Sequence, residues 1–161
     1  MKLPFFGDIN PESLQDYYKA VINFEGSNLE LDLNFENSSI DEKNLRQTAN
    51  LLENLKESID KVKGFINEDF QTGDAVDEYI TFHLEELFEE DLDELLKDTD
   101  KTLSQREQFF SLLHLERIGF YPECENHHTV FDFVVNRDFS DNLLVVKLKE
   151  NGELDHITME S

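Results

Sequence analysis

The strongest fold signal in the chain lies in residues 128–160, HTVFDFVVNRDFSDNLLVVKLKENGELDHITME, which contain three strand-like segments in succession. Apolar residues alternate or cluster in the first two segments, 128–135 and 142–149, as they do in strands that bury one or both faces. Asn151 and Gly152 precede the third segment, and this pair favours a tight hairpin turn because both residues tolerate positive φ. The stretch therefore predicts an antiparallel meander. The side chains that we expect to face the core are Phe131, Phe133, Val135, Leu144, Val146 and Leu148.

Two more strand-like regions lie N-terminal to this meander. Residues 115–123 have the composition of one further strand that precedes it. Residues 17–36, YYKAVINFEGSNLELDLNFE, predict a hairpin around the turn EGSN, because apolar and polar residues alternate on both sides of the turn. The alternating apolar residues are Tyr18, Ala20, Ile22 and Phe24 before the turn and Leu29, Leu31, Leu33 and Phe35 after it.

The segment that follows the hairpin has the periodicity of an amphipathic helix. Ser39 and Glu42 have the spacing of a capping box, which marks a helix start. Apolar residues then recur at steps of three and four, and we expect this helix to end near Gly64. The residues of this stripe are Leu45, Thr48, Leu52, Leu55, Ile59, Val62 and Ile66.

Two further helices are expected before residue 115. Asp74 is placed to cap a second long helix, and Ser104 with Glu107 forms another capping box for a short third one. His83 lies in the apolar stripe of the second helix, where a hydrogen-bonded core histidine is more common than a metal ligand. The stripe consists of Val76, Tyr79, Ile80, His83, Leu84, Leu87 and Phe88, and it is extended by Leu92, Leu95 and Leu96.

The order of these elements predicts the fold class. Strands do not alternate with helices along the chain, which argues against a doubly wound parallel sheet. We therefore expect an α+β fold with an antiparallel sheet of about six strands, made of the N-terminal hairpin and the C-terminal meander. Two long helices and one short helix should pack on one face of this sheet. No linker or repeat divides the chain, so residues 1–161 are expected to form a single domain.

The composition limits the kind of partner. The formal net charge is −23, which repels nucleic acid and anionic lipid surfaces and attracts basic proteins. Cys124 is the only cysteine, so no internal disulfide can form, as is usual in a reducing cytoplasm. No apolar run approaches the roughly 20 residues of a membrane-spanning helix. These observations predict a cytoplasmic protein with no membrane and no nucleic-acid partner.

The negative charge is concentrated in one part of the chain. Residues 41–63 carry five acidic and five basic residues, whereas residues 64–100 carry fourteen acidic residues and a single base, Lys97. On one helix, acids at four-residue spacing would repel each other, so stability alone does not favour the arrangement. We therefore expect a face that binds a basic partner. The alternatives left open are a face tuned for solubility and a face neutralised by the chain's own bases. The candidate partner-binding residues are Glu85, Glu86, Glu89, Glu90, Asp93 and Glu94.

One short cluster has the composition of a metal site. Cys124, His127 and His128 have a spacing compatible with metal ligands in a loop. A structural zinc site usually needs four ligands from two such clusters, and the chain has no second cysteine. A polar connecting loop is therefore the simpler interpretation, and no cofactor is expected. A small metal-binding domain or metal-dependent enzyme is kept as the alternative, although no phosphate-binding or nucleophile motif predicts an enzyme.

Residues 131–161, FDFVVNRDFSDNLLVVKLKENGELDHITMES, resemble the C-terminal segment of a bacterial family of small acidic cytoplasmic proteins, a domain of unknown function. The opening MKLPFFGDIN and the strand LELDLNFEN are similar to the start of the same family. These proteins are similar in character to the immunity proteins of bacterial toxin systems. Together with the negative charge, the resemblance predicts a non-enzymatic, immunity-type inhibitor that binds a basic toxin or another basic partner. Exposed aromatic residues would supply apolar anchors in such a complex, and the candidates are Phe5, Phe6 and Tyr121. A housekeeping protein whose acidity serves solubility is the remaining alternative.

Overall fold

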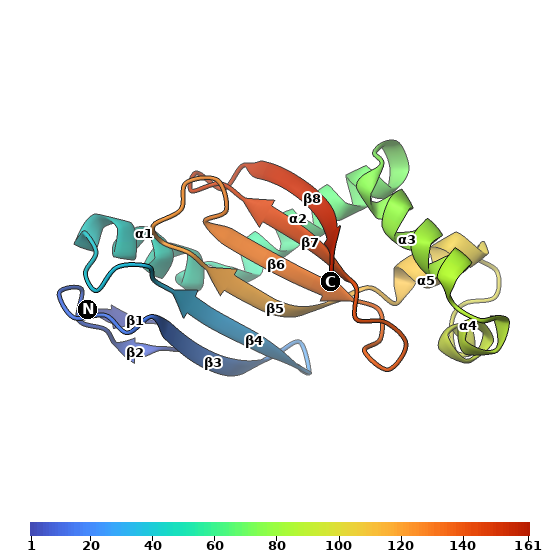
Figure 1. The fold of residues 1–161 in the computed structure, drawn as a ribbon, viewed down its shortest axis with the longest axis horizontal. Coiled ribbons are helices and arrows are strands. Elements are labelled where there is room, and N and C mark those ends of the chain that lie inside the picture. The colour runs from blue at the N-terminus through green and yellow to red at the C-terminus, as the bar shows by residue number, and fades with distance from the viewer.

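The structure is a computed structural model that describes residues 1–161 (Figure 1). It contains five helices, one six-stranded sheet and one two-stranded sheet. The strands are β1 (Lys2–Leu3), β2 (Gly7–Asp8), β3 (Tyr17–Phe24), β4 (Ser27–Asn34), β5 (His114–Phe120), β6 (Thr129–Val134), β7 (Leu143–Leu148) and β8 (Leu154–Glu160). The helices are α1 (Glu42–Glu53), α2 (Leu55–Thr72), α3 (Ala75–Glu86), α4 (Glu89–Leu96) and α5 (Gln105–Ser111). The α+β class and the six-stranded sheet are confirmed.

The six-stranded sheet is mixed, with the order β3-β4-β5-β6-β7-β8. The hairpin β3–β4 and the meander β5–β8 are antiparallel, as predicted, but β4 and β5 run parallel, with Leu31 opposite Ile118. The prediction of a wholly antiparallel sheet is therefore wrong. Tight turns impose antiparallel pairing within the hairpin and the meander, whereas the long helical connection from β4 to β5 allows either direction.

The two predicted hairpin turns differ in form. Between β3 and β4, Glu25 and Gly26 have φ values of 50° and 84°, so both central residues are left-handed, as a two-residue turn of the I′ type requires. Between β7 and β8, Gly152 has a φ of 81° while Asn151 stays outside the left-handed region, and the connection is longer. The hairpin at Asn151 and Gly152 is confirmed, but the two-residue form of its turn is wrong.

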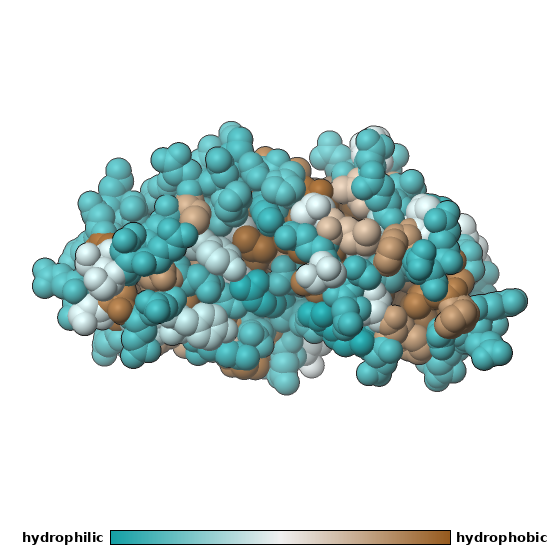
Figure 2. Space-filling view, in the orientation of Figure 1, coloured by the Kyte–Doolittle hydropathy of each residue, from teal (hydrophilic) through white to brown (hydrophobic).

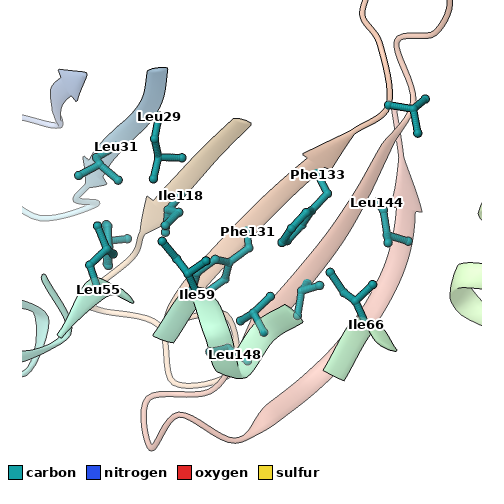
Figure 3. Close-up of a cluster of buried hydrophobic side chains, with 14 of the residues drawn as sticks. Leu29, Leu31, Leu55, Ile59, Ile66, Ile118, Phe131, Phe133, Leu144 and Leu148 are labelled. Atoms are coloured by element: carbon teal, nitrogen blue, oxygen red, sulfur yellow. The ribbon is translucent and has the colours of Figure 1, made fainter. Parts of the chain in front are cut away.

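The core lies between α2 and one face of the sheet (Figure 3). Leu55, Ile59 and Ile66 of α2 point at apolar side chains from β4, β5, β6 and β7. Every predicted core residue of the meander and of the second hairpin strand is buried. The opposite face of the sheet carries no helix, while α3, α4 and α5 gather at one end of the molecule (Figure 1). None of the helices is both long and apolar enough to cross a membrane.

The two long helices of the prediction are four helices in the structure. The first is interrupted at Asn54, where φ is −109° and ψ is 33°, and it resumes as α2, which runs through Gly64 to Thr72. The second is interrupted at Leu87 and Phe88, whose extended backbone separates α3 from α4. No proline or glycine marks either break, and the apolar residues continue at helical spacing across both. The sequence therefore gives no sign of the interruptions.

The predicted helix caps are confirmed only in part. Ser104 and Glu107 form a complete capping box at α5. At α1 the N-cap is Asp41, whose carboxylate accepts the backbone N–H of Lys43, so the predicted start at Ser39 is wrong. Asp74 takes the N-cap position of α3 without a side-chain hydrogen bond.

His83 is the hydrogen-bonded core residue that the sequence predicts. It is 1% exposed. Its Nδ1 lies 2.7 Å from the carbonyl oxygen of Tyr79, and its Nε2 lies 2.7 Å from Oγ of Ser140. Because a carbonyl can only accept, Nδ1 carries the hydrogen and Nε2 accepts the Ser140 hydroxyl in the neutral ring. Burial lowers the pKa of His83, although the Tyr79 carbonyl acts in the opposite direction.

This buried neutral histidine predicts a loss of stability in mild acid. Since the pKa of His83 is lower in the folded chain than its ordinary 6.5, the unfolded chain takes up the proton first. The contribution of His83 to stability is therefore complete above the ordinary pKa and falls as the pH drops below it. We expect the difference in free energy of unfolding between wild type and His83→Asn to be constant from about pH 8 to about pH 7 and to shrink towards about pH 5. Urea unfolding measures it, and the comparison removes the effect of carboxylate protonation. A difference that stays constant down to the lowest pH contradicts this account.

Candidate interaction surface and buried charge cluster

The six acidic residues singled out in the sequence lie where α3 ends and α4 begins, and we call this surface the acidic corner. All six side chains are exposed: Glu85, Glu86, Glu89, Glu90, Asp93 and Glu94. The break between the helices changes their expected relation, because it separates Glu85 and Glu86 from the acids of α4, and four-residue spacing within one helix remains only for two pairs, Glu89 with Asp93 and Glu90 with Glu94. The expectation that the whole set repels along a single helix is therefore wrong.

The acidic corner is not neutralised by the chain's own bases. Glu94 pairs with Lys97, with 2.5 Å between Oε1 and Nζ, and the other five acids take part in no ion pair. At the other end of α3, in its first turn, Asp77 pairs with Arg106. The charge of the acidic corner is thus directed at solvent.

Helix electrostatics explain only part of this charge. Glu89 and Glu90 lie in the first turn of α4, where a carboxylate is favoured by the positive end of the helix dipole. Glu85 and Glu86 lie in the last turn of α3, where the same effect opposes a negative charge. Local stability therefore does not account for the acids on the α3 side.

Phe88 projects from the middle of the acidic corner. It is 79% exposed, the largest value among the exposed large apolar residues of the chain. The sequence prediction placed Phe88 on a buried stripe and is wrong, because the break at Leu87 ends that stripe and the apolar face of α4 starts again at Leu92. Figure 2 shows hydrophobic beside hydrophilic surface at this end of the molecule.

The predicted aromatic anchors do not join the acidic corner. Phe5 is 51% exposed but lies in the β1–β2 turn, at the end of the molecule opposite α4 (Figure 1). Phe6 is half-buried and packs against the core. Tyr121 is half-buried, and its hydroxyl accepts a hydrogen bond from Arg117. Phe88, which the sequence did not single out, is the exposed aromatic residue at the acidic corner.

The structure does not bring Cys124, His127 and His128 together as a site. His128 is fully buried, whereas His127 is exposed, and no group of three or more His, Cys, Asp or Glu residues could hold a metal ion. Burial raises the pKa of the Cys124 thiol, and the carboxylates of Glu36 and Glu123 raise it further, which disfavours a thiolate.

The loop that carries these residues has a structural role instead. The Glu123 carboxylate accepts the backbone N–H of Glu36 at 2.6 Å and two N–H groups of Asn37 at 3.2 and 2.7 Å. These bonds tie the β5–β6 connection to the end of β4. The interpretation as a polar connecting loop agrees with this geometry.

A charged cluster on the helix-free face of the sheet was missed by the sequence analysis. Arg117 of β5 donates from Nε and Nη2 to the two carboxylate oxygens of Asp32, at 2.5 and 2.9 Å, and from Nη1 to Asp132 at 2.9 Å. Its Nη2 also donates to the Tyr121 hydroxyl at 3.0 Å. We call these four residues the Arg117 cluster. It joins β4, β5 and β6 across the parallel pair.

Burial makes the charges of the Arg117 cluster interdependent. Asp32 is 1% and Asp132 7% exposed. Burial raises the pKa of Asp132, and the adjacent guanidinium opposes this shift. Burial would lower the pKa of Arg117, but its hydrogen bonds to Asp32 and Tyr121 and its charge partners raise it overall, so Arg117 stays cationic. The signal in the sequence was Asp132, the one acid inside an otherwise apolar strand.

No known protein family, curated protein or solved structure matches this chain. The acidic corner and the Arg117 cluster are the two features of the chain that bear on its function. The resemblance to a bacterial family stays a prediction.

Proposed function

We propose that this protein is a non-enzymatic interaction protein that binds a basic protein through the acidic corner. The observation that carries the proposal is Phe88, 79% exposed among five carboxylates without an internal cation. An aromatic side chain left in water adds nothing to folding, and aromatic residues in a desolvated interface centre are the usual energetic anchors of protein complexes.

The two features of the acidic corner would act at different stages of binding. The carboxylates create a negative field that accelerates encounter with a positively charged surface, and this effect weakens as salt is added. Phe88 then enters an apolar pocket of the partner and slows dissociation. A face that serves solubility alone explains the carboxylates but not the exposed ring at their centre.

We propose more specifically that the protein is an immunity-type inhibitor that acts in the cytoplasm. The excess of acid over base suits a target with a basic surface, such as a toxin that binds nucleic acid. The lone cysteine, Cys124, suits a reducing compartment. The metal-dependent alternative receives no support from the positions of Cys124, His127 and His128.

Replacement of Phe88 by alanine should weaken partner binding by about 30-fold or more while leaving the thermal midpoint unchanged, because the ring is exposed in the free protein. The partner is first isolated from the native host on the tagged wild-type chain and identified, and its affinity is then measured by calorimetry. Phe5→Ala is the matched control, since Phe5 is an exposed aromatic residue at the other end of the molecule.

Neutralising the six acids of the acidic corner with Gln and Asn should lower the association rate by about tenfold or more and flatten its salt dependence. A partner that is acidic, or one whose affinity survives both Phe88→Ala and the six-acid variant at low salt, overturns the proposal.

A further inference from the structure

A cavity lies on the helix-free face of the sheet beside the Arg117 cluster. Its volume is about 300 Å³, which is at the lower end of the range for small-molecule sites. Val145 lies opposite Asp132 in the β6–β7 register, and Val130 lies opposite Lys147, so apolar and charged side chains adjoin on this face. The apolar side of the cavity is formed by Val130, Leu143 and Val145, and its charged side by Arg117, Asp132 and Lys147.

The charges around this cavity are unequal in number. Asp32 and Asp132 share a single guanidinium, that of Arg117. At the rim, Lys147 pairs with Glu160, with 3.3 Å between Nζ and Oε2. The cavity itself is lined by two cations and two of these carboxylates, with His127 and Ser161 beside them. Asp32 adds a third carboxylate that shares Arg117, so the ion-paired group holds one more negative than positive charge.

Asp132 has one oxygen available to a ligand. Its Oδ2 accepts from Arg117, but no protein group donates to its Oδ1, and Oδ1 is not among the enclosed atoms that lack a partner. Because Asp132 is 7% exposed and lines the cavity, this oxygen opens into the cavity. Burial, which raises the pKa of Asp132, also marks a carboxylate that an additional cation would stabilise.

Arg117 is poorly suited to hold an anion here, since its Nε and Nη2 atoms and one Nη1 hydrogen already serve Asp32, Asp132 and Tyr121. The guanidinium is also fixed in place. A Cβ atom on Gly119 would lie 2.6 Å from Nη2 of Arg117 and 3.0 Å from Cε2 of Tyr121, so both side chains lie directly on the backbone. The cluster is therefore preorganised: Arg117 is held in place, and its hydrogen bond holds the Asp132 carboxylate in position at the cavity.

We propose that this cavity binds a small organic cation, a primary alkylammonium compound. Its ammonium group donates to Oδ1 of Asp132, and its hydrocarbon chain covers Val130, Leu143 and Val145. A bare metal ion does not fit, because no three ligating side chains converge. The site is separate from the acidic corner and does not depend on the function proposed for it.

The test is an NMR titration of the full-length ¹⁵N-labelled protein with butylammonium chloride in moderate salt. We expect saturable shifts of amides in β5, β6 and β7 around the cavity. Butyrate and 1-butanol have the same chain without the positive charge, and they should leave these amides unmoved. Shifts confined to the acidic corner, or equal shifts with butyrate, overturn the proposal.

Variants separate a defined site from general attraction to an acidic protein. Asp132→Asn keeps the shape of the side chain and should weaken butylammonium binding by about tenfold or more. Asp138→Asn, which removes an exposed acid outside the cavity, should leave it unchanged. Leu143→Trp fills the apolar side of the cavity without changing any charge, and it should abolish binding. This variant tests the site independently should Asp132→Asn fail to fold. Phe88→Ala should have no effect. Undiminished binding by Leu143→Trp overturns the proposal.

Discussion

Replacing Arg117 with methionine is expected to cost about 3–5 kcal/mol of the free energy of unfolding, the range for breaking a buried ion pair from one side. The reason is that Asp32 and Asp132 would remain buried without their common counter-charge. Methionine fills much of the volume of the arginine chain, so loss of packing contributes little. Urea unfolding at neutral pH measures the change, and the loss should shrink as the pH falls and Asp132, whose pKa is raised by burial, takes up a proton.

Two further variants test whether the loss of stability comes from the burial of the charges. Arg137→Met removes an exposed pair with Glu116 and should cost only about 0–1 kcal/mol. The triple variant Arg117→Met, Asp32→Asn, Asp132→Asn should regain most of the stability, because no unpaired charge is left buried. A loss from Arg117→Met as small as that from Arg137→Met contradicts the account of the cluster as a coupled, desolvated unit.

Phe131→Ala is expected to destabilise the protein by about 3–5 kcal/mol, the usual cost of removing a buried phenyl ring. Phe131 has no exposed surface and lies in the central strand β6, between Ile118 and Val146 in the register. Figure 3 shows its ring beside Ile59 of α2, so removing the ring would leave an empty space between this helix and the sheet. Chemical unfolding measures the loss.

The control for this prediction is Phe5→Ala, which removes the same ring from a position that is 51% exposed. It should change the stability by no more than about 0.5 kcal/mol. If both variants lose similar amounts, α2 and the sheet do not form the main core.

The meander and the hairpin were predictable because their signals are local. Period-two alternation in residues 29–35 and the apolar runs of 128–135 and 142–149 determine which side chains are buried, whatever the order of strands in the sheet. The capping box of Ser104 and Glu107 is local in the same sense. The breaks at Asn54 and Phe88 left no such signal, since apolar residues continue at helical spacing through both.

The candidate sites likewise combine features that are visible in the sequence with features that depend on the fold. The excess of acid at Glu85–Glu94 is visible in the sequence, but whether internal bases pair with it depends on the fold. The exposure of Phe88 was hidden by the assumption of one continuous helix. Asp132 was visible as an unusual acid in an apolar strand, yet its partner Arg117 sits on a neighbouring strand.

Local sequence patterns were sufficient to predict the α+β class, the antiparallel pairing within the hairpin and within the meander, the buried side chains of β4, β6 and β7, and the concentration of negative charge. These properties depend on residues a few positions apart. Three features required the folded chain to be seen: the parallel pairing of β4 with β5, the exposure of Phe88, and the ion pair between Asp32 and Arg117, which are 85 positions apart. Contacts of that range depend on how the helices that connect β4 to β5 pack against the sheet, and no local pattern records that packing.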